Sequence, residues 1–302
     1  VRQKALFITR QMWEQRQVNE GKLSDAMIAY ITALCDPAVT TVVCAGGPGS
    51  GKTFTATLVS LLLVHKGLSK KLYHTKPLVS AGGQGLGYER GSMTDKLTFW
   101  VRPTQQASER VAEMENIPSE QLASAVESFP IDRTRGLSLP EGDWLIADEM
   151  QNCHMPLFSC VATRAETGAK VVLCGDPDQE DVLFTKARPG GMASIVGAWR
   201  QLREAAQEGA EASTVEAKAK LIGITKSFRL VDLGRDCNVR SANNTEFSNW
   251  LMDMNKTKAK QVAVLSAAEM EHLSGERRDK YLLQLAAEEY GDWSGHQCGV
   301  DT

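Results

Sequence analysis

A glycine-rich segment that ends in lysine and threonine carries the clearest chemistry in this sequence. Residues 46–53 read Gly-Gly-Pro-Gly-Ser-Gly-Lys-Thr and satisfy the pattern G-x-x-x-x-G-K-[ST]. Glycines let a loop wrap around phosphate with successive N–H groups pointing inward. We expect Lys52 to reach the β- and γ-phosphates of a nucleotide, and the Thr53 hydroxyl to ligate Mg²⁺. The expected nucleotide contacts are Gly46, Gly47, Pro48, Gly49, Ser50, Gly51, Lys52, Thr53 and Phe54.

The segments before and after this loop distinguish it from an ordinary glycine-rich turn that happens to contain a lysine. The apolar run 40–45 precedes it and predicts a strand. The segment 52–65 predicts a helix that stops at Gly67. The positive end of such a helix adds to the attraction for phosphate.

Two adjacent carboxylates follow a second apolar run. The run 144–147 predicts a strand, and Asp148 and Glu149 come directly after it. We expect Asp148 to hold the Mg²⁺ shell and Glu149 to orient and deprotonate the attacking water. Alone, the pair could be a solvated turn, but the phosphate loop makes the catalytic interpretation stronger.

A third polar segment follows the apolar run 171–174. Residues 175–179 read Gly-Asp-Pro-Asp-Gln, which in isolation would more often be a turn. Ligands of open α/β sheets bind at the carboxyl ends of strands, where this segment is expected. The neutral amide of Gln179 could bond both the γ-phosphate and the water, so Gln179 is included among the catalytic candidates.

Strand-like and helix-like segments alternate along the chain, which is typical of parallel βαβ units. Strands are predicted at 40–45, 71–75, 144–147 and 170–174, with one more at 220–225. Helices are predicted at 1–20, 23–35, 52–65, 247–254 and 265–290. The expected fold is a three-layer α/β/α P-loop domain with a mostly parallel sheet. The expected divisions are a helical extension (1–39), the core (40–200), a charged insertion (201–220), and a last strand with a helical segment (221–302).

Composition narrows the function classes. With 42% hydrophobic and 24% charged residues the chain reads as a globular protein, and its net charge of −3 gives no large positive field. Nucleic acid would therefore need a local basic strip. No apolar run is long enough to span a membrane, and the first residues lack a signal-peptide core, so an intracellular location is expected. The cysteines form no CxxC pair, so we expect core thiols and no zinc.

With these residues in place, the chain resembles the PhoH-like branch of the superfamily 1 helicase-like ATPases over about residues 40–196. The segments 148–152 (Asp-Glu-Met-Gln-Asn) and 175–179 are similar to two motifs of that branch. A longer stretch, from Thr75-Lys76-Pro77 through several glycines to Arg102-Pro103, is similar to a third.

The resemblance implies a RecA-like fold, ATP with Mg²⁺, and single-stranded nucleic acid, with RNA favoured over DNA. It also implies a ring-shaped homo-oligomer such as a hexamer, with no membrane partner. A neighbouring subunit would then supply an arginine to the γ-phosphate. Arg229 and Arg235, which lie in segments similar to family motifs, are the two candidates.

The sequence also departs from the family pattern. Lys76 stands where an arginine is usual, and Met27 stands roughly where relatives carry a glutamine that reads adenine. Gln11, Gln15 and Gln17 are open alternatives for that role. The residues before the loop are too few for the PIN ribonuclease that many such proteins carry there, so no second nuclease site is expected.

Three functions fit these features to different degrees. The first is an ATP-driven nucleic-acid motor or remodeller, with Lys76, Arg102, Arg133 and Arg135 as candidates for a phosphate-binding strip. The second is a nucleotide-dependent scaffold in which slow hydrolysis acts as a timer. The third is a P-loop kinase, which is disfavoured because a kinase must avoid a water-activating base such as Glu149.

Overall fold

A six-stranded sheet with the order β3-β2-β4-β5-β1-β6 forms the centre of the protein in this computed structural model. The strands are β1 (Thr41–Ala45), β2 (Leu72–Lys76), β3 (Val126–Pro130), β4 (Trp144–Ala147), β5 (Lys170–Gly175) and β6 (Phe228–Asp232). Each neighbouring pair is parallel. The predicted α/β class is therefore confirmed. The structure describes residues 1–16, 21–77, 102–179, 190–207 and 227–234.

The strands β1, β2, β4 and β5 confirm the four best strand predictions to within one residue at each end. The strands β3 and β6 were not predicted. They occupy the two ends of the strand order, where a strand has one neighbour instead of two. The strand predicted at 220–225 and the helices predicted at 247–254 and 265–290 lie outside the described residues.

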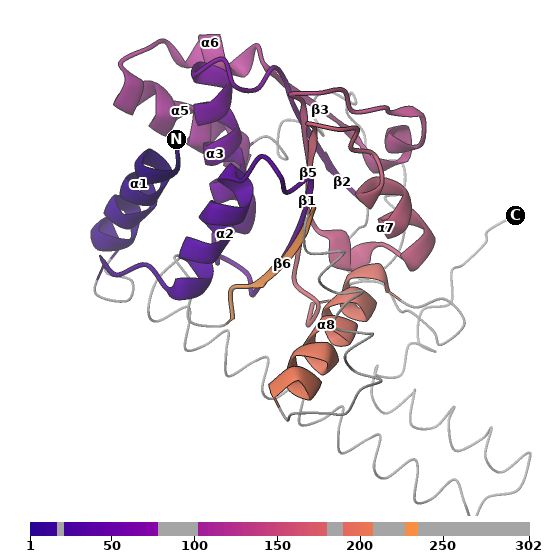
Figure 1. Ribbon diagram of the computed structural model, residues 1–302. Coiled ribbons are helices and arrows are strands. Elements are labelled where there is room, and N and C mark those ends of the chain that lie inside the picture. Colours follow the sequence, from indigo (N-terminus) through magenta and orange to yellow (C-terminus); the bar gives the residue numbers. More distant parts are fainter. Residues whose placement is uncertain (17–20, 78–101, 180–189, 208–226, 235–302) are drawn as a thin grey trace, which may run out of the picture. The chain divides into compact units, whose positions relative to one another are not determined.

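The helices that the structure describes cover both faces of the sheet (Figure 1). They are α1 (Arg2–Gln15), α2 (Asp25–Cys35), α3 (Lys52–His65), α5 (Arg102–Glu115), α6 (Ser119–Ala123), α7 (Met155–Ala162) and α8 (Gly191–Gln207). The first three confirm predicted helices. The start of α2 is fixed by Ser24, whose side chain accepts a hydrogen bond from the Met27 N–H. Gly67, just after α3, has a φ of 68°, as a helix stop requires.

Two apolar cores flank the sheet. One packs α1, α2, α3, α5 and α6 against alternate strand residues such as Cys44 and Ile146. The other packs α7 and α8 against the intervening residues, such as Val43 and Leu145. Burial on both faces explains why the central strands read as continuous apolar runs.

The parallel arrangement brings the carboxyl ends of the strands to one edge. There β1 leads into the phosphate loop, β4 into Asp148, and β5 into Asp176. The helix α8 runs without a break through residue 200, where we expected the core to end. All described residues fall within the compact unit Val1–Glu246. In the described part of the chain, no helix is both long and apolar enough to cross a lipid bilayer.

Candidate nucleotide site

The phosphate loop joins β1 to α3 and depends on its glycines. Gly49 and Gly51 have φ values of 77° and 81°, a conformation that other residues rarely adopt. The N–H of Gly46 donates to the carbonyl of Gly175 over 3.2 Å, which ties the loop to the end of β5. Lys52 is the first residue of α3, so the loop leads directly into the positive end of that helix.

The ammonium group of Lys52 lies inside this loop. Its Nζ donates to the carbonyls of Gly46 and Gly47 over 2.6 and 2.9 Å, and to the Ser50 hydroxyl over 3.3 Å. The lysine therefore projects into the concavity that phosphate is expected to fill. Phosphate oxygens would be stronger acceptors for this cation than the neutral carbonyls are.

The helix α2 contacts the start of α3, where the phosphate loop ends. The Tyr30 hydroxyl is fully buried and donates to the Lys52 carbonyl over 3.1 Å. Burial, and then the neighbouring Cys174 and Cys44, raise the pKa of Tyr30, so the phenol stays protonated and keeps its donor. One turn earlier on α2, the fully buried sulfur of Met27 accepts from the Thr55 hydroxyl over 3.8 Å. The side chain at position 27 is therefore part of the core.

The two carboxylates at the end of β4 lie in a distorted turn. The Asp148 N–H bonds the Thr75 carbonyl of β2, and the Asp148 carboxylate accepts from the Glu149 N–H over 3.0 Å. Glu149 has a φ of 55°, a left-handed conformation that is costly for a residue other than glycine. Strain of this kind concentrates at functional sites. The turn leads into the short 3₁₀ helix η3 (Met150–Asn152).

Gln151 links this turn to the end of β5, a role that sequence reasoning missed. Its amide nitrogen donates to the Glu149 carboxylate over 2.6 Å, and its amide oxygen accepts from the Asp176 N–H over 3.1 Å. The side chain is 2% exposed. A Cβ at Gly175 would lie 2.6 Å from the same amide oxygen, so the contact needs glycine there. The only indication in the sequence was the position of Gln151 within the Asp-Glu-Met-Gln-Asn motif.

The surroundings of Glu149 suit a general base. Burial, and then the adjacent charge of Asp148, raise its pKa above the ordinary glutamate value. The bond from Gln151 and the charges of Lys52 and Lys76 oppose that rise. A base works best when its pKa approaches the working pH, so an upward shift makes this carboxylate a better proton acceptor.

Thr53 and Asp148 fit a shared cation. Thr53 is the second residue of α3, and Asp148 directly follows β4 at the same edge of the sheet. Burial and the Asp148 charge raise the pKa of the Cys174 thiol to about 12. Hydroxyl and carboxylate oxygens are the hard ligands that Mg²⁺ prefers, and Mg²⁺ usually takes its other ligands from nucleotide phosphates and water.

The segment after β5 forms the expected turn. The Asp176 carboxylate accepts from the Asp178 N–H over 3.0 Å, and the Gln179 N–H bonds the Asp176 carbonyl. Gln179 is exposed at the same sheet edge as Glu149. The loop, the carboxylate pair and this turn therefore follow the neighbouring parallel strands β1, β4 and β5 at one edge of the sheet.

Of the two arginine candidates, Arg229 lies away from this cluster. Arg229 pairs in register with Val42 inside the sheet, and its guanidinium donates to the Phe228 carbonyl over 2.9 Å. It lies three residues before the end of β6, roughly 10 Å from the carboxyl edge. Arg235 lies outside the described residues. Of the proposed basic strip, Arg133 and Arg135 are exposed on a 3₁₀ helix that follows β3, and Lys76 ends β2.

The bridge made by Gln151 leads to a testable expectation. Gln151→Leu should lower kcat for ATP hydrolysis about 10–100-fold, the usual effect of losing a neighbour that orients a reacting group. Binding of ATP should change little, because the phosphate loop does not depend on this amide. Steady-state phosphate release and calorimetric ATP titration would separate the two quantities. An unchanged kcat would show that Glu149 is oriented without Gln151.

Comparisons with known proteins find a matching family and several relatives. The family described as PhoH-like protein matches residues 23–224. A PhoH-like protein of Synechocystis sp. is 32% identical over 153 residues, which are 51% of this chain and 45% of that protein. Protein PhoH2 of Bacillus subtilis is 31% identical over 157 residues, which are 50% of this chain and 35% of that protein. The matched parts thus cover less than half of these relatives.

Proposed function

Because the chain belongs to the PhoH-like family of P-loop ATPases, we propose that it hydrolyses ATP to ADP and phosphate with Mg²⁺. We also propose that hydrolysis is coupled to the binding or remodelling of single-stranded nucleic acid, with RNA favoured over DNA. One observation carries the proposal for hydrolysis. A strained Glu149, held by Gln151, follows β4 at the same sheet edge as a phosphate loop that already encloses the Lys52 ammonium.

Each residue has a distinct part in this reaction. Lys52 exchanges its loop carbonyls for the β- and γ-phosphates. Glu149 takes a proton from the attacking water, and Gln151 holds the Glu149 carboxylate in place. Gln179, at the same edge of the sheet, contacts the γ-phosphate. A Mg²⁺ ion held by Thr53 and Asp148 would supply charge neutralisation on the phosphates.

The coupling to nucleic acid rests on charge placement. The whole chain has a net charge of −3, so binding of a phosphate backbone depends on local cations. Lys76 and Pro130 are register partners, and Arg133 and Arg135 follow Pro130 at the carboxyl edge. The strands β2 and β3, which these three cations follow or end, are separated from β1 and its phosphate loop by β4 and β5. The three cations are our candidates for contacts with a nucleic-acid backbone.

Phosphate release measured with and without single-stranded RNA tests this function. We expect RNA to accelerate release, DNA to do so less, and the acceleration to fall as salt rises. Release without any response to nucleic acid would favour the nucleotide-dependent scaffold or timer. Phosphate transfer to a small acceptor in place of water would favour a kinase.

Assembly provides a second expectation within this proposal. If a neighbouring subunit supplies the arginine, Arg235→Ala should bind ATP but lose most of its turnover, because the finger is typically worth about 10³–10⁵-fold. Adding Lys52→Ala subunits, which still offer an intact arginine, should restore part of the activity. Turnover that is independent of protein concentration, with no rescue in the mixture, would place the arginine within its own chain. Arg229→Ala is tested in the same way, because Arg229, half-buried on the edge strand β6, is the second candidate.

A further inference from the structure

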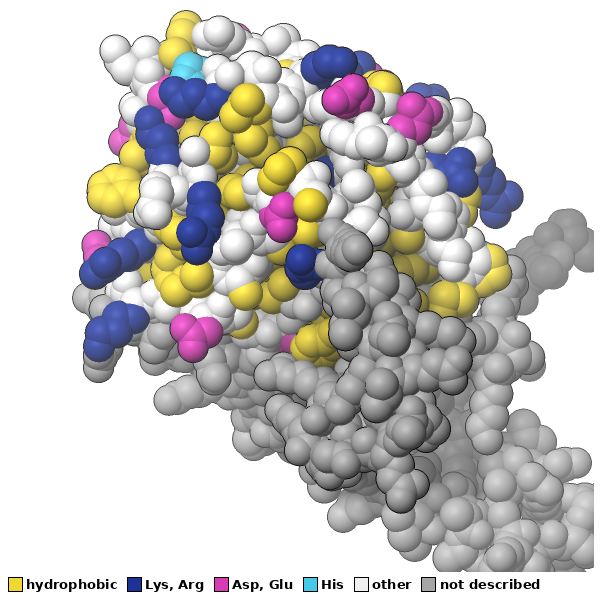
Figure 2. Space-filling view, in the orientation of Figure 1, with side chains coloured by type: hydrophobic (Ala, Val, Ile, Leu, Met, Phe, Trp, Pro, Cys, Tyr) yellow, Lys and Arg dark blue, Asp and Glu magenta, His cyan; other side chains and the backbone are white. Residues whose placement is uncertain are grey.

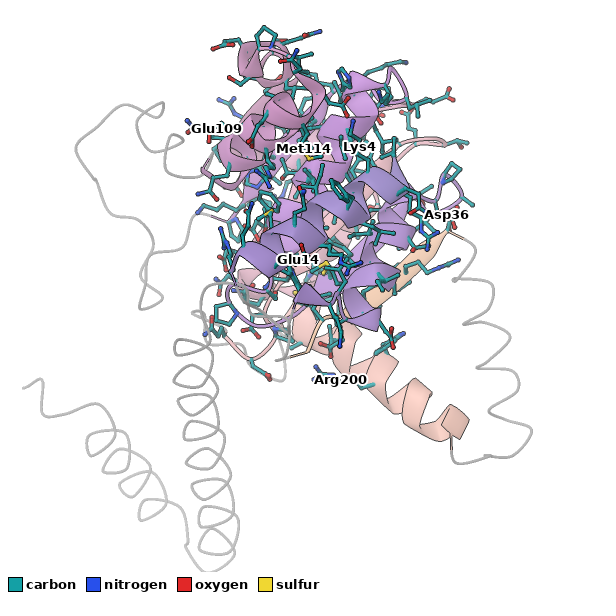
Figure 3. All side chains as sticks on the ribbon, turned by 90° about the vertical axis from the view of Figure 1, so that its left-hand side faces the viewer. Lys4, Glu14, Asp36, Glu109, Met114 and Arg200 are labelled. Carbon is teal, nitrogen blue, oxygen red and sulfur yellow. The ribbon has the colours of Figure 1, made fainter. Side chains whose placement is uncertain are left out.

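A polar cavity lies where α5 and α6 meet the edge strand β3. The strand order separates β3 from β1 and its phosphate loop by three strands. The cavity has a volume of about 440 Å³, within the range of about 300–1,000 Å³ that is typical of small-molecule sites. Figure 3 labels Glu109, an exposed residue of α5 that lines it. Hydroxyls and carboxylates from all three elements contribute to the lining: Thr104, Ser108, Ser119, Ser128, Glu109 and Glu120.

The Thr104 hydroxyl is a buried polar group of this cavity without a partner. Thr104 is 2% exposed, and its Oγ1 finds no hydrogen-bond partner among the residues that the structure describes. A threonine inside a helix can donate to the carbonyl four residues earlier, but Thr104 is only the third residue of α5. A buried hydroxyl is unfavourable until it forms a hydrogen bond. A polar ligand in the cavity would supply that bond.

The charges of the lining select a cation over an anion. Glu109 of α5 and Glu120 of α6 supply carboxylates from two helices, and the described lining contains no Lys, Arg or His. An anion would be repelled, because no positive charge of the lining would hold it. A metal ion is also disfavoured, since the described part of the chain contains no group of three or more His, Cys, Asp or Glu that could hold one. An organic cation fits the lining better.

Alkylammonium groups match the acceptors of this cavity. An ammonium group has three N–H donors and no acceptor, and the lining offers carboxylate and hydroxyl oxygens. The Gln105 amide donates to one oxygen of Glu109 over 3.2 Å, so the other oxygen can accept from a ligand. Ala123 and Val126 supply apolar side chains, against which the methylene groups of such a ligand can pack. Because the carboxylates belong to two helices, a chain with several ammonium groups can contact both.

We infer that this cavity binds an aliphatic polyamine. Its ammonium groups donate to the carboxylates of Glu109 and Glu120 and to the Thr104 hydroxyl. Its methylene groups pack against Ala123 and Val126. Binding of this cation goes beyond the proposed ATP hydrolysis and requires neither ATP nor Mg²⁺.

Calorimetric titration with spermidine, in the absence of nucleotide, tests this inference. The wild type should bind spermidine saturably and should not bind octanediol, a neutral chain of similar length. Thr104→Val keeps the shape of the side chain and should weaken spermidine binding about 10-fold, because it removes a buried hydrogen bond to a charged group. Glu120→Gln should weaken binding about 2–5-fold, as is usual for an exposed ion pair.

The matched control excludes attraction by carboxylates elsewhere on the protein. Figure 2 shows Asp and Glu side chains at several separate places on one face of the molecule. Glu127, between Val126 and Ser128 on β3, is an exposed carboxylate that does not line the cavity. Glu127→Gln should therefore bind spermidine like the wild type. Equal affinity in Thr104→Val and wild type, an equal loss in Glu127→Gln, or no saturable binding to the wild type would each overturn the inference.

Thermal unfolding gives an independent measurement. Without spermidine, Thr104→Val should unfold no earlier than the wild type, because the substitution removes a buried hydroxyl that has no partner. Spermidine should raise the unfolding temperature of the wild type more than that of Thr104→Val, since a ligand stabilises the folded state in proportion to its occupancy. A Thr104→Val variant that unfolds earlier in the absence of spermidine would show that the hydroxyl already has a partner, and would also overturn the inference.

Discussion

Lys52→Ala is expected to abolish ATP hydrolysis and to weaken ATP binding. The Lys52 ammonium is enclosed by the phosphate loop, where it bonds the carbonyls of Gly46 and Gly47 and the Ser50 hydroxyl. A positive charge at that point offsets the negative charge that develops on the transferred phosphoryl group. Removing one such preorganised group typically costs about 10²–10³-fold in turnover, and this lysine also binds the ground state. Phosphate release and ATP titration measure the two losses.

The control for this variant lies at the other end of the same helix. Lys66→Ala removes an exposed lysine that follows α3 and pairs with Glu115 over 3.7 Å. Its turnover should match the wild type. The circular dichroism spectrum of Lys52→Ala should also match the wild type, which separates loss of chemistry from loss of fold. Normal turnover in Lys52→Ala would show that residues 46–53 are not the phosphate site.

Glu149→Gln should retain ATP binding and lose turnover by about 10²–10⁴-fold, the usual contribution of a general base. The substitution keeps the shape of the side chain but removes its ability to accept a proton. Glu127→Gln is the matched control, because Glu127 is an exposed carboxylate on β3 that pairs with Lys71. Accumulation of bound ATP in Glu149→Gln, measured after rapid separation of the protein, would confirm that binding survives. An unimpaired rate would assign the base to another residue.

The pH dependence of turnover follows from the same carboxylate. The general base must be deprotonated, so the rate falls as pH decreases through its pKa. Burial and the adjacent Asp148 raise that pKa, so the acidic limb of the profile should lie above the range of an ordinary glutamate. The bond from Gln151 lowers the pKa, and Gln151→Leu should therefore move the limb to still higher pH. A limb that does not move would separate Gln151 from the titrating group.

The phosphate loop, the carboxylate pair and the four central strands could be predicted from the amino-acid sequence. These features are local: glycines at fixed spacing favour a phosphate-binding turn, and strands buried on both faces read as short apolar runs. The edge strands β3 and β6 were not predicted, because they are less buried and do not read as apolar runs. β3 reads Val-Glu-Ser-Phe-Pro, with polar residues at partly exposed positions, and β6 begins with a half-exposed Phe-Arg pair.

The contacts between these local features depend on the tertiary structure. The strand order places β5 beside β1, so Gly175 meets Gly46 although the two are far apart in the sequence. The bridge of Gln151 between Glu149 and Asp176 exists because β4 and β5 are neighbours, and no local pattern specifies that pairing. Likewise, a pocket of this protein is lined by residues from three helices: Gln15 of α1, Phe54 of α3 and Arg110 of α5. Their side chains meet because α1, α3 and α5 pack on the same face of the sheet, which is a property of the assembled core.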